Sequence, residues 1–489
     1  MASAFAFDMR TLLSVVFWFC IGMHQWEWKT HAQESTLSSV KEVKLSDIVV
    51  VVLSQSHPYH QKRAELFRDH FEKQLKGLAE KDRPDLLLTH EVWPEMNGAW
   101  TIFPLAAPLA KLYGNKRWII FCEEDTRMDV QRLPSILQQH DDIDEPFLGR
   151  GLTDAQSTII HHYASYPPHF AYPDFTAGMA LSLPLIKRLA VYFTDGSGQK
   201  IQFSIDPKHE LAKYLWDNLD VRLEPVCEFC GTPTSKAKDC DCVAWQPTPF
   251  PTHCGPPIGK SELFVAVKTC SKFHEDRVPV VQNTWGKDAQ LIEYYSDVEN
   301  TSIPTVDLGV PNTESGHCGK TRAIIHNIAR KRELASLEWL LIADDDTIIN
   351  LELLRSLLSC YKSDEPVFLG ERYGYAVAAG YGYNYITGGG GMVFNRAAVD
   401  LVANEFSCPS VDSPDDMILG MFFTSRGLAN THSRYFHQAR PYDYSPDFLS
   451  TQIPVSFHKH WNCDPYEVYK QLVAAKLPQL SSADRHEEL

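Results

Sequence analysis

The stretch WLLIADDDTIINL at Trp339–Leu351 repeats the pattern of WIIFCEEDTRMDV at Trp118–Val130. In both stretches an apolar run that begins with tryptophan ends in three acidic residues followed by a threonine. Continuous apolar runs that contain β-branched residues are typical of strands buried on both faces of a mainly parallel sheet. The pair therefore predicts that one α/β unit occurs twice in this chain.

Three further blocks recur in the same order around this pair. In the first of them, His60 and Arg63 fall on His274 and Arg277. Four blocks in one order indicate a tandem duplication of a domain of about 200 residues. The three further pairs are Ile48–Phe71 with Leu263–Val281, Glu145–Gly149 with Glu365–Gly370, and Phe175–Ala190 with Ile386–Ala403.

The fold class that follows is α/β, with two tandem Rossmann-type domains. The predicted strands are Asp47–Leu53, Trp118–Cys122, Leu263–Val267 and Trp339–Ala343, and helices are expected over Arg63–Leu78 and Thr321–Leu334. The expected divisions are a signal peptide at 1–32, an N-terminal domain at 33–225, a Cys- and Pro-rich linker at 226–259, a catalytic domain at 260–485 and a tail at 486–489.

Net charge excludes one class of partner. The 489 residues carry a formal net charge of −16, whereas binding to a phosphate backbone depends on clustered Lys and Arg. A nucleic acid partner is therefore not expected.

Both ends of the chain predict the secretory pathway. Arg10 precedes the apolar run Thr11–Met23, which is short for a membrane span and fits a signal peptide cleaved near Ala32; a type II membrane anchor is the competing interpretation. The last four residues, His486–Leu489 (HEEL), are a close variant of the ER retrieval signal. We expect a soluble protein of the ER lumen, without a stable membrane span, that is bound by the retrieval receptor.

Five cysteines crowd into Cys227–Cys254. Their spacing also fits a structural zinc site, but in an oxidising compartment we expect disulfides in this linker. Removal of Cys20 with the signal peptide leaves eleven cysteines of twelve, so at least one thiol should stay free or pair between chains. The sequon at Asn300 predicts a glycosylated surface position.

Three consecutive aspartates, Asp344, Asp345 and Asp346, follow a buried strand and repel one another unless a cation compensates them. Carboxylate oxygens suit Mg²⁺ or Mn²⁺, and an added imidazole shifts the preference toward Mn²⁺. A solvated acidic loop is the alternative. The glycine run at 388–391 allows close approach of backbone to a ligand, while the acids of Ser413–Met417 (SPDDM) could equally be helix-capping residues.

Taken in order, these motifs resemble the fringe-like and core 1 family of inverting β1,3-glycosyltransferases. The resemblance covers most of Leu263–His460. The residues that carry it are FVAVKTC at 264–270, HEDR at 274–277, TW at 284–285, YYSD at 294–297, ADDD at 343–346, the glycine run, SPDDM at 413–417 and SFH at 456–458.

The resemblance implies a GT-A-type fold, a UDP-sugar donor and a Mn²⁺ ion, or possibly Mg²⁺. Within the family the chain looks most like the members that move glucose from UDP-glucose to the 3-hydroxyl of O-linked fucose on thrombospondin type 1 repeats. Asp346 and His458 then bind the metal, and Asp416 is the base. The residues expected around the nucleotide sugar are Thr269, Arg277, Asp297, Asp344, Asp345, Gly389 and Gly390.

The N-terminal copy lacks part of this pattern. It keeps Glu123-Glu124-Asp125, but its glycine run is reduced to Ala177-Gly178, and Asp206–His209 (DPKH) replaces the acidic helix start. We predict that this copy is degenerate and inactive and that it binds the protein acceptor or supports the catalytic domain. Asp125 remains a possible residual metal ligand.

Two alternatives stay open. One is a related enzyme that uses UDP-galactose or UDP-N-acetylglucosamine, because one or two pocket contacts decide between sugars. The other is a lumenal lectin or folding cofactor without catalysis.

Overall fold

A computed structural model describes residues 42–475 except for 142, 165–166, 168–169, 195–200, 233–239, 252–253 and 335. The predicted signal peptide and the HEEL tail lie outside the described residues. The residues described from Val43 onward belong to one compact unit. The division into domains at 225 and 260 therefore stays a prediction.

The N-terminal half is built on a six-stranded sheet of order β10-β5-β8-β3-β1-β2. Its strands are β1 (Ile48–Leu53), β2 (Asp85–Leu88), β3 (Trp118–Glu123), β5 (Phe147–Gly149), β8 (Met179–Ser182) and β10 (Glu224–Pro225). All pairings are parallel except the two made by β8. Every residue of β1 is buried, as its apolar run predicts.

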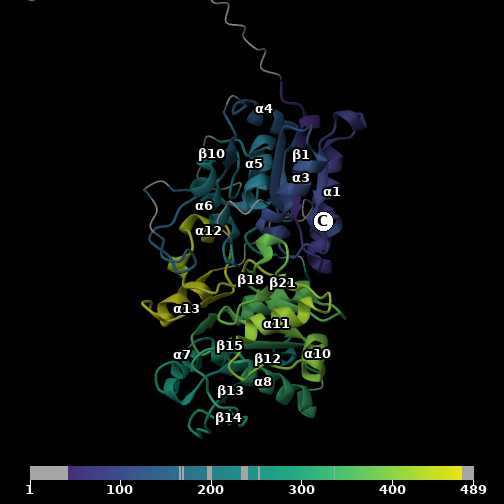
Figure 1. Ribbon diagram of the computed structural model, residues 1–489. Coiled ribbons are helices and arrows are strands. Elements are labelled where there is room, and N and C mark those ends of the chain that lie inside the picture. Colours follow the sequence, from purple (N-terminus) through teal and green to yellow (C-terminus); the bar gives the residue numbers. More distant parts are fainter. Residues whose placement is uncertain are drawn as a thin grey trace, which may run out of the picture. The chain divides into compact units, whose positions relative to one another are not determined.

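The C-terminal half is built on a seven-stranded sheet of order β14-β13-β12-β15-β20-β17-β21 (Figure 1). Its strands are β12 (Leu263–Lys268), β13 (Leu291–Ser296), β14 (Thr305–Asp307), β15 (Trp339–Asp344), β17 (Phe368–Gly370), β20 (Met392–Asn395) and β21 (Asn430–His432). Here β20 is the reversed strand, paired antiparallel with β15 and β17.

The four repeated sequence blocks occupy equivalent strands of the two sheets. They fall on β1 and β12, β3 and β15, β5 and β17, and β8 and β20, and the order and direction of these strands agree. The expected mainly parallel sheet is correct apart from one reversed strand in each. An apolar run does not specify strand direction, because burial satisfies it equally in either orientation.

Amphipathic helices cover the sheets. In the C-terminal half, Ile324, Ile325 and Ile328 of α8 share one hydrophobic cluster with Ile342 of β15 and Phe394 of β20. Burying a side chain of this size stabilises the fold by about 1.5–3 kcal/mol. The principal helices are α1 (Pro58–Gln74), α3 (Ala106–Leu112), α5 (Leu183–Thr194), α6 (Pro207–Leu219), α7 (Val278–Asn283), α8 (Cys318–Arg330), α9 (Leu351–Leu358), α10 (Arg396–Glu405), α11 (Asp415–Thr424) and α13 (Pro465–Ala474).

Two small sheets connect distant parts of the sequence. Strand β9 (Phe203–Ser204) of the N-terminal half pairs with β18 (Arg372–Tyr375), which also pairs with β19 (Tyr383–Ile386). Strand β16 (Thr347–Ile349) pairs with β22 (Ser456–His458). None of the helices in the described residues is long and apolar enough to cross a membrane.

Disulfides confirm the expectation for the linker. Cys227 pairs with Cys240 and Cys230 with Cys242, so these four cysteines do not form a zinc site. The other pairs are Cys254 with Cys360 and Cys318 with Cys408; in the described chain Cys122, Cys270 and Cys463 are free. The odd number of cysteines thus leaves free thiols, as predicted.

The Cys254–Cys360 disulfide joins residues 106 positions apart. Replacing both cysteines with serine should lower the free energy of unfolding by about 2–5 kcal/mol, because the crosslink restricts a long loop of the unfolded chain. The measurement is denaturant unfolding followed by circular dichroism, with the replacement of Cys227 and Cys240 as comparison. A smaller loss for the long loop than for the short one would contradict this expectation.

Candidate active site

The acidic triplet lies at the carboxyl end of β15, the edge where open α/β sheets bind ligands. Pairing of β16 with β22 places His458 opposite Thr347, next to this edge. The Nε2 atom of His458 lies 3.1 Å from Oδ1 of Asp346 and 3.9 Å from Oδ2 of Asp344. Two residues that the sequence predicts as metal ligands, Asp346 and His458, are therefore brought together.

Two side chains of the protein partly neutralise these acids. Nζ of Lys268 lies 3.1 Å from Asp344 and 2.9 Å from Asp415, and Nη1 of Arg277 lies 3.1 Å from Asp345 and 2.9 Å from Asp346. Two positive charges thus face four carboxylates. The remaining negative charge favours a bound divalent cation.

The pKa values of Asp345 and Asp346 move in opposite directions. Burial raises the pKa of Asp345 to about 6, and the neighbouring Asp346 carboxylate adds to this rise. Burial acts in the same direction on Asp346, but hydrogen bonding and charge attraction from His458 hold its pKa well below the usual range. Asp346 is therefore ionised at neutral pH, as a metal ligand must be.

Asp344, Asp346 and His458 offer ligand atoms that all lie within 4.8 Å of one another, and they can hold a metal ion. The Nδ1 atom of His458 lies 3.0 Å from the carbonyl oxygen of Gln438. A proton on Nδ1 would donate to that carbonyl, which leaves Nε2 as the metal-binding nitrogen. The set of two carboxylates and one imidazole fits Mn²⁺.

The glycine run packs closely against His458. A Cβ atom on Gly389 would lie 2.3 Å from Nδ1 of His458, so no larger residue fits there. The carbonyl oxygen of Gly389 accepts a hydrogen bond from Thr347, and the amide of Gly390 donates to Gln438. Both glycines are buried, and contact with a nucleotide sugar stays a prediction for them.

Helix α11 presents two aspartates with different surroundings. Asp415 is buried and accepts hydrogen bonds from Lys268 and Thr321. Asp416 is partly exposed and accepts a hydrogen bond from the amide of Met417. Burial and, to a smaller extent, the neighbouring Asp415 carboxylate together raise the pKa of Asp416 to about 7. Asp416 is therefore the residue of this pair that can exchange a proton near neutral pH.

The residues predicted for the nucleotide pocket surround the same edge. Thr269 follows β12 and donates a hydrogen bond of 2.7 Å to Asp345, whose other oxygen contacts Arg277. Asp297 follows β13 and accepts hydrogen bonds from the amide and hydroxyl of Ser271. Asn300 is half-buried, and its side-chain nitrogen lies 3.3 Å from His274.

The N-terminal triplet is surrounded by cations of the protein itself. His60 contacts Glu124, and Arg63 forms an ion pair with Asp125. Burial raises the pKa of Glu123 to about 7, against the opposing charge of Arg434. Among the described residues, the groups that could hold a metal ion do not include Asp125.

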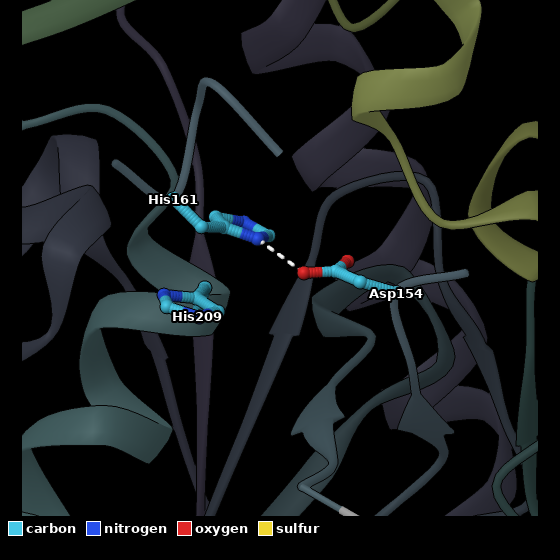
Figure 2. A group of neighbouring side chains, drawn as sticks. All are labelled: Asp154, His161 and His209. Atoms are coloured by element: carbon cyan, nitrogen blue, oxygen red, sulfur yellow. Dashed lines mark hydrogen bonds and ion pairs between the residues drawn. The ribbon is translucent and has the colours of Figure 1, made fainter. Parts of the chain in front are cut away.

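A second group of potential metal ligands lies in the N-terminal half: Asp154, His161 and His209 (Figure 2). The rings of His161 and His209 stack with centroids 3.6 Å apart and planes 8° apart, so one ion cannot lie in both ring planes. His161 contacts Asp154 at 2.6 Å and Asp206 at 3.2 Å; burial lowers its pKa, but these two carboxylates raise it to about 9. This group is an ion-pair network around a protonated histidine.

Sequence reasoning missed Lys268 and Gln438. Lys268 could have been found, because the parallel pairing of β12 with β15 places it directly beside Asp344. Gln438 has no signal in the sequence, since it acts through its backbone carbonyl on a histidine 20 residues away.

A cation-binding acidic edge, next to an aspartate that titrates near pH 7, is suited to a phosphate-containing donor and an acceptor that must lose a proton. The profile of the Fringe-like family matches residues 43–211 and 258–475. The chain therefore belongs to the Fringe-like family, and it is a glycosyltransferase.

Curated relatives agree with this family. The mouse protein named beta-1,3-glucosyltransferase is 49% identical over 94% of this chain and 93% of its own length. The human protein of that name is 49% identical over 89% of this chain and 87% of its own length. A Xenopus laevis glycoprotein-N-acetylgalactosamine 3-beta-galactosyltransferase is 29% identical over 32% of this chain and 42% of its own. The two 49% identical relatives confirm the prediction of a β1,3-glucosyltransferase.

Proposed function

We propose that this chain transfers glucose from UDP-glucose to the 3-hydroxyl of O-linked fucose on thrombospondin type 1 repeats, with inversion at the anomeric carbon. The two mammalian relatives support glucose as the sugar. The observation that carries the proposal is that ligand atoms of Asp344, Asp346 and His458 lie within 4.8 Å of one another, while Asp416, which interacts electrostatically with Asp344, has a pKa of about 7.

On the donor side, Asp346 and His458 would hold Mn²⁺, with Mg²⁺ as the possible substitute. When bound, the ion acts as a Lewis acid toward the diphosphate of the leaving group. Arg277 can fork onto phosphate oxygens, while Asp344 and Asp345 accept hydrogen bonds from ribose and sugar hydroxyls. Thr269, Asp297, Gly389 and Gly390 complete the wall that positions the nucleotide sugar.

On the acceptor side, Asp416 is the general base. Its carboxylate takes the proton from the 3-hydroxyl of fucose as that oxygen attacks the anomeric carbon from the face opposite UDP. Asp415 is less suited to this step: burial opposes its ionisation, but Lys268 and Thr321, which both donate to its Oδ2 atom, lower its pKa and so make it a weaker base.

We further propose that two tandem GT-A-like domains form the chain and that the N-terminal one is degenerate. The matching strand orders of the two sheets and the two family matches support this division. In the N-terminal copy Lys208 lies 2.8 Å from Asp206, near the place of the base, so this half would bind the acceptor or support the catalytic half. The signal peptide and the HEEL tail favour the ER lumen as its location, with a glycan on Asn300.

Activity should depend on pH through Asp416. A general base works as the carboxylate, so kcat/KM should rise about tenfold per pH unit below the pKa of about 7 and level off above it. Initial rates between about pH 5.5 and 8.5 at fixed Mn²⁺ test this expectation. A flat profile across this range would exclude Asp416 as the titrating group.

A donor panel tests the proposed reaction. Purified protein with Mn²⁺ and an O-fucosylated thrombospondin repeat is offered UDP-glucose, UDP-galactose and UDP-N-acetylglucosamine, and the product is identified by mass spectrometry and linkage analysis. We expect a glucose–fucose disaccharide. Transfer of another sugar would replace the donor assignment, and binding without transfer would favour a lectin or folding cofactor.

A further inference from the structure

A cavity of about 110 Å³ lies at the carboxyl ends of β1 and β3; we call it the inner cavity. Leu53 and Glu123 line it from the N-terminal half, and Glu371, Arg372 and Arg434 line it from the C-terminal half. None of the proposed catalytic residues Asp344, Asp346, Asp416 and His458 belongs to its lining. It is therefore a site separate from the candidate active site.

The inner cavity is lined by guanidinium groups with buried nitrogen atoms that have no hydrogen-bond partner in the described protein. The Nε, Nη1 and Nη2 atoms of Arg434 are all buried, and they have no hydrogen-bond partner. The Nε atom of Arg372 is in the same state. Within the described residues no carboxylate lies within 4.0 Å of Arg434, although Glu123 on the same wall interacts with it electrostatically. Burying a guanidinium without hydrogen-bond partners is energetically costly. We therefore expect a bound molecule that hydrogen bonds to Arg434 and Glu123.

The side chains of Arg434 and Glu123 restrict which kind of molecule can bind in the inner cavity. A group that bridges Arg434 and Glu123 must accept hydrogen bonds from the guanidinium. It must also hydrogen bond to the Glu123 carboxyl group in its ionised and its protonated form, because burial raises the pKa of Glu123 to about 7. A hydroxyl does both, whereas an ammonium cannot accept a hydrogen bond and a phosphate dianion would bring two negative charges beside the Glu123 carboxylate. Trp100, Phe175 and Phe448 supply apolar surface beside these charges. Convergent polar groups on an apolar wall are typical of small-molecule sites.

A larger cavity lies next to the inner cavity. This outer cavity, of about 330 Å³, shares Leu53, Gln55, Trp100 and Arg372 with the inner one. It is also lined by exposed residues, among them Glu95. The inner cavity therefore adjoins a cavity at the protein surface along these four shared residues.

We propose that the inner cavity binds a neutral sugar residue whose hydroxyl groups bridge Arg434 and Glu123. The N-terminal half, together with residues of the C-terminal half, then forms a carbohydrate-binding site additional to the donor site. Sugar binding at this place does not depend on which nucleotide sugar is the donor.

The first test is binding of free monosaccharides to the wild-type protein in EDTA. Glucose, galactose, fucose and N-acetylglucosamine are examined by saturation-transfer NMR, with inorganic phosphate as a competitor. We expect at least one sugar to bind and phosphate not to displace it. Absence of sugar binding at about 50 mM, or displacement by phosphate, would overturn the proposal; the latter result would indicate an anion site.

Matched variants locate the binding. Arg434→Met removes the unpaired donors, and Arg426→Met removes an exposed arginine that pairs with Glu405. Arg434→Met should weaken sugar binding at least about tenfold, as expected for losing a hydrogen bond to a charged group, while Arg426→Met binds like wild type. Equal binding by the two variants contradicts the proposal. If Arg434→Met does not fold, a crystal of the wild-type protein soaked in the bound sugar decides, since density outside the inner cavity rejects it.

Discussion

Replacing Asp416 with asparagine should lower kcat for glucose transfer by about 10²- to 10⁴-fold, the usual contribution of a general base. Asparagine has nearly the same size, and it keeps an oxygen that can accept the hydrogen bond from the Met417 amide. The helix start is thus preserved while the proton acceptor is lost. The measurement is initial-rate kinetics at saturating UDP-glucose, together with calorimetric titration of UDP in the presence of Mn²⁺.

Asp412→Asn is the matched control for this experiment. Asp412 lies four residues earlier and is exposed, so its replacement should leave kcat unchanged. UDP affinity and thermal stability of Asp416→Asn should stay close to those of wild type. Turnover within twofold of wild type would remove Asp416 from the mechanism, and loss of UDP affinity would reassign it to donor binding.

Replacing Asp346 with asparagine should weaken Mn²⁺-dependent binding of UDP by at least about 100-fold. Even residues that only support metal ligands cost about 10- to 100-fold in metal affinity, and Asp346 is itself a proposed ligand. Its ionised oxygens contact His458 at 3.1 Å and Arg277 at 2.9 Å. Calorimetry of UDP with Mn²⁺ and again with EDTA measures the metal-dependent part of the affinity.

The sequence repeat provides the control for this second prediction. Asp125 occupies the place of Asp346 in the N-terminal half, but among the described residues the groups that could hold a metal ion include Asp346 and not Asp125. Asp125→Asn should therefore leave Mn²⁺-dependent UDP binding as it is, once an unchanged melting temperature shows that the variant is folded. If Asp125→Asn abolished the binding and Asp346→Asn did not, the donor site would belong to the N-terminal half.

Much of the sheet architecture could be predicted from local sequence. The runs predicted as strands at 47–53, 118–122, 263–267 and 339–343 are β1, β3, β12 and β15, with ends shifted by at most one residue. The helices were placed less accurately, since α8 begins at Cys318 and ends at Arg330, three and four residues before the predicted bounds. The apolar runs at 118–122 and 339–343 end where acidic residues begin, so the ends of these strands are visible in the sequence. Helix ends depend on capping contacts, which hydrophobic periodicity does not show.

By itself the sequence determined the duplicated α/β pattern, the acidic ends of two buried strands and membership of a motif-rich family, because each of these is written in neighbouring residues. Tertiary structure alone decided that His458 contacts Asp346 across 112 positions of sequence and that Lys268 donates a hydrogen bond to Asp415. It also decided that Arg434 lines the same cavity as Glu123 of the other half. Strand pairing and burial bring these residues together and set their charge states. Neither can be read from local sequence, because both depend on how segments far apart in the chain are arranged in the fold.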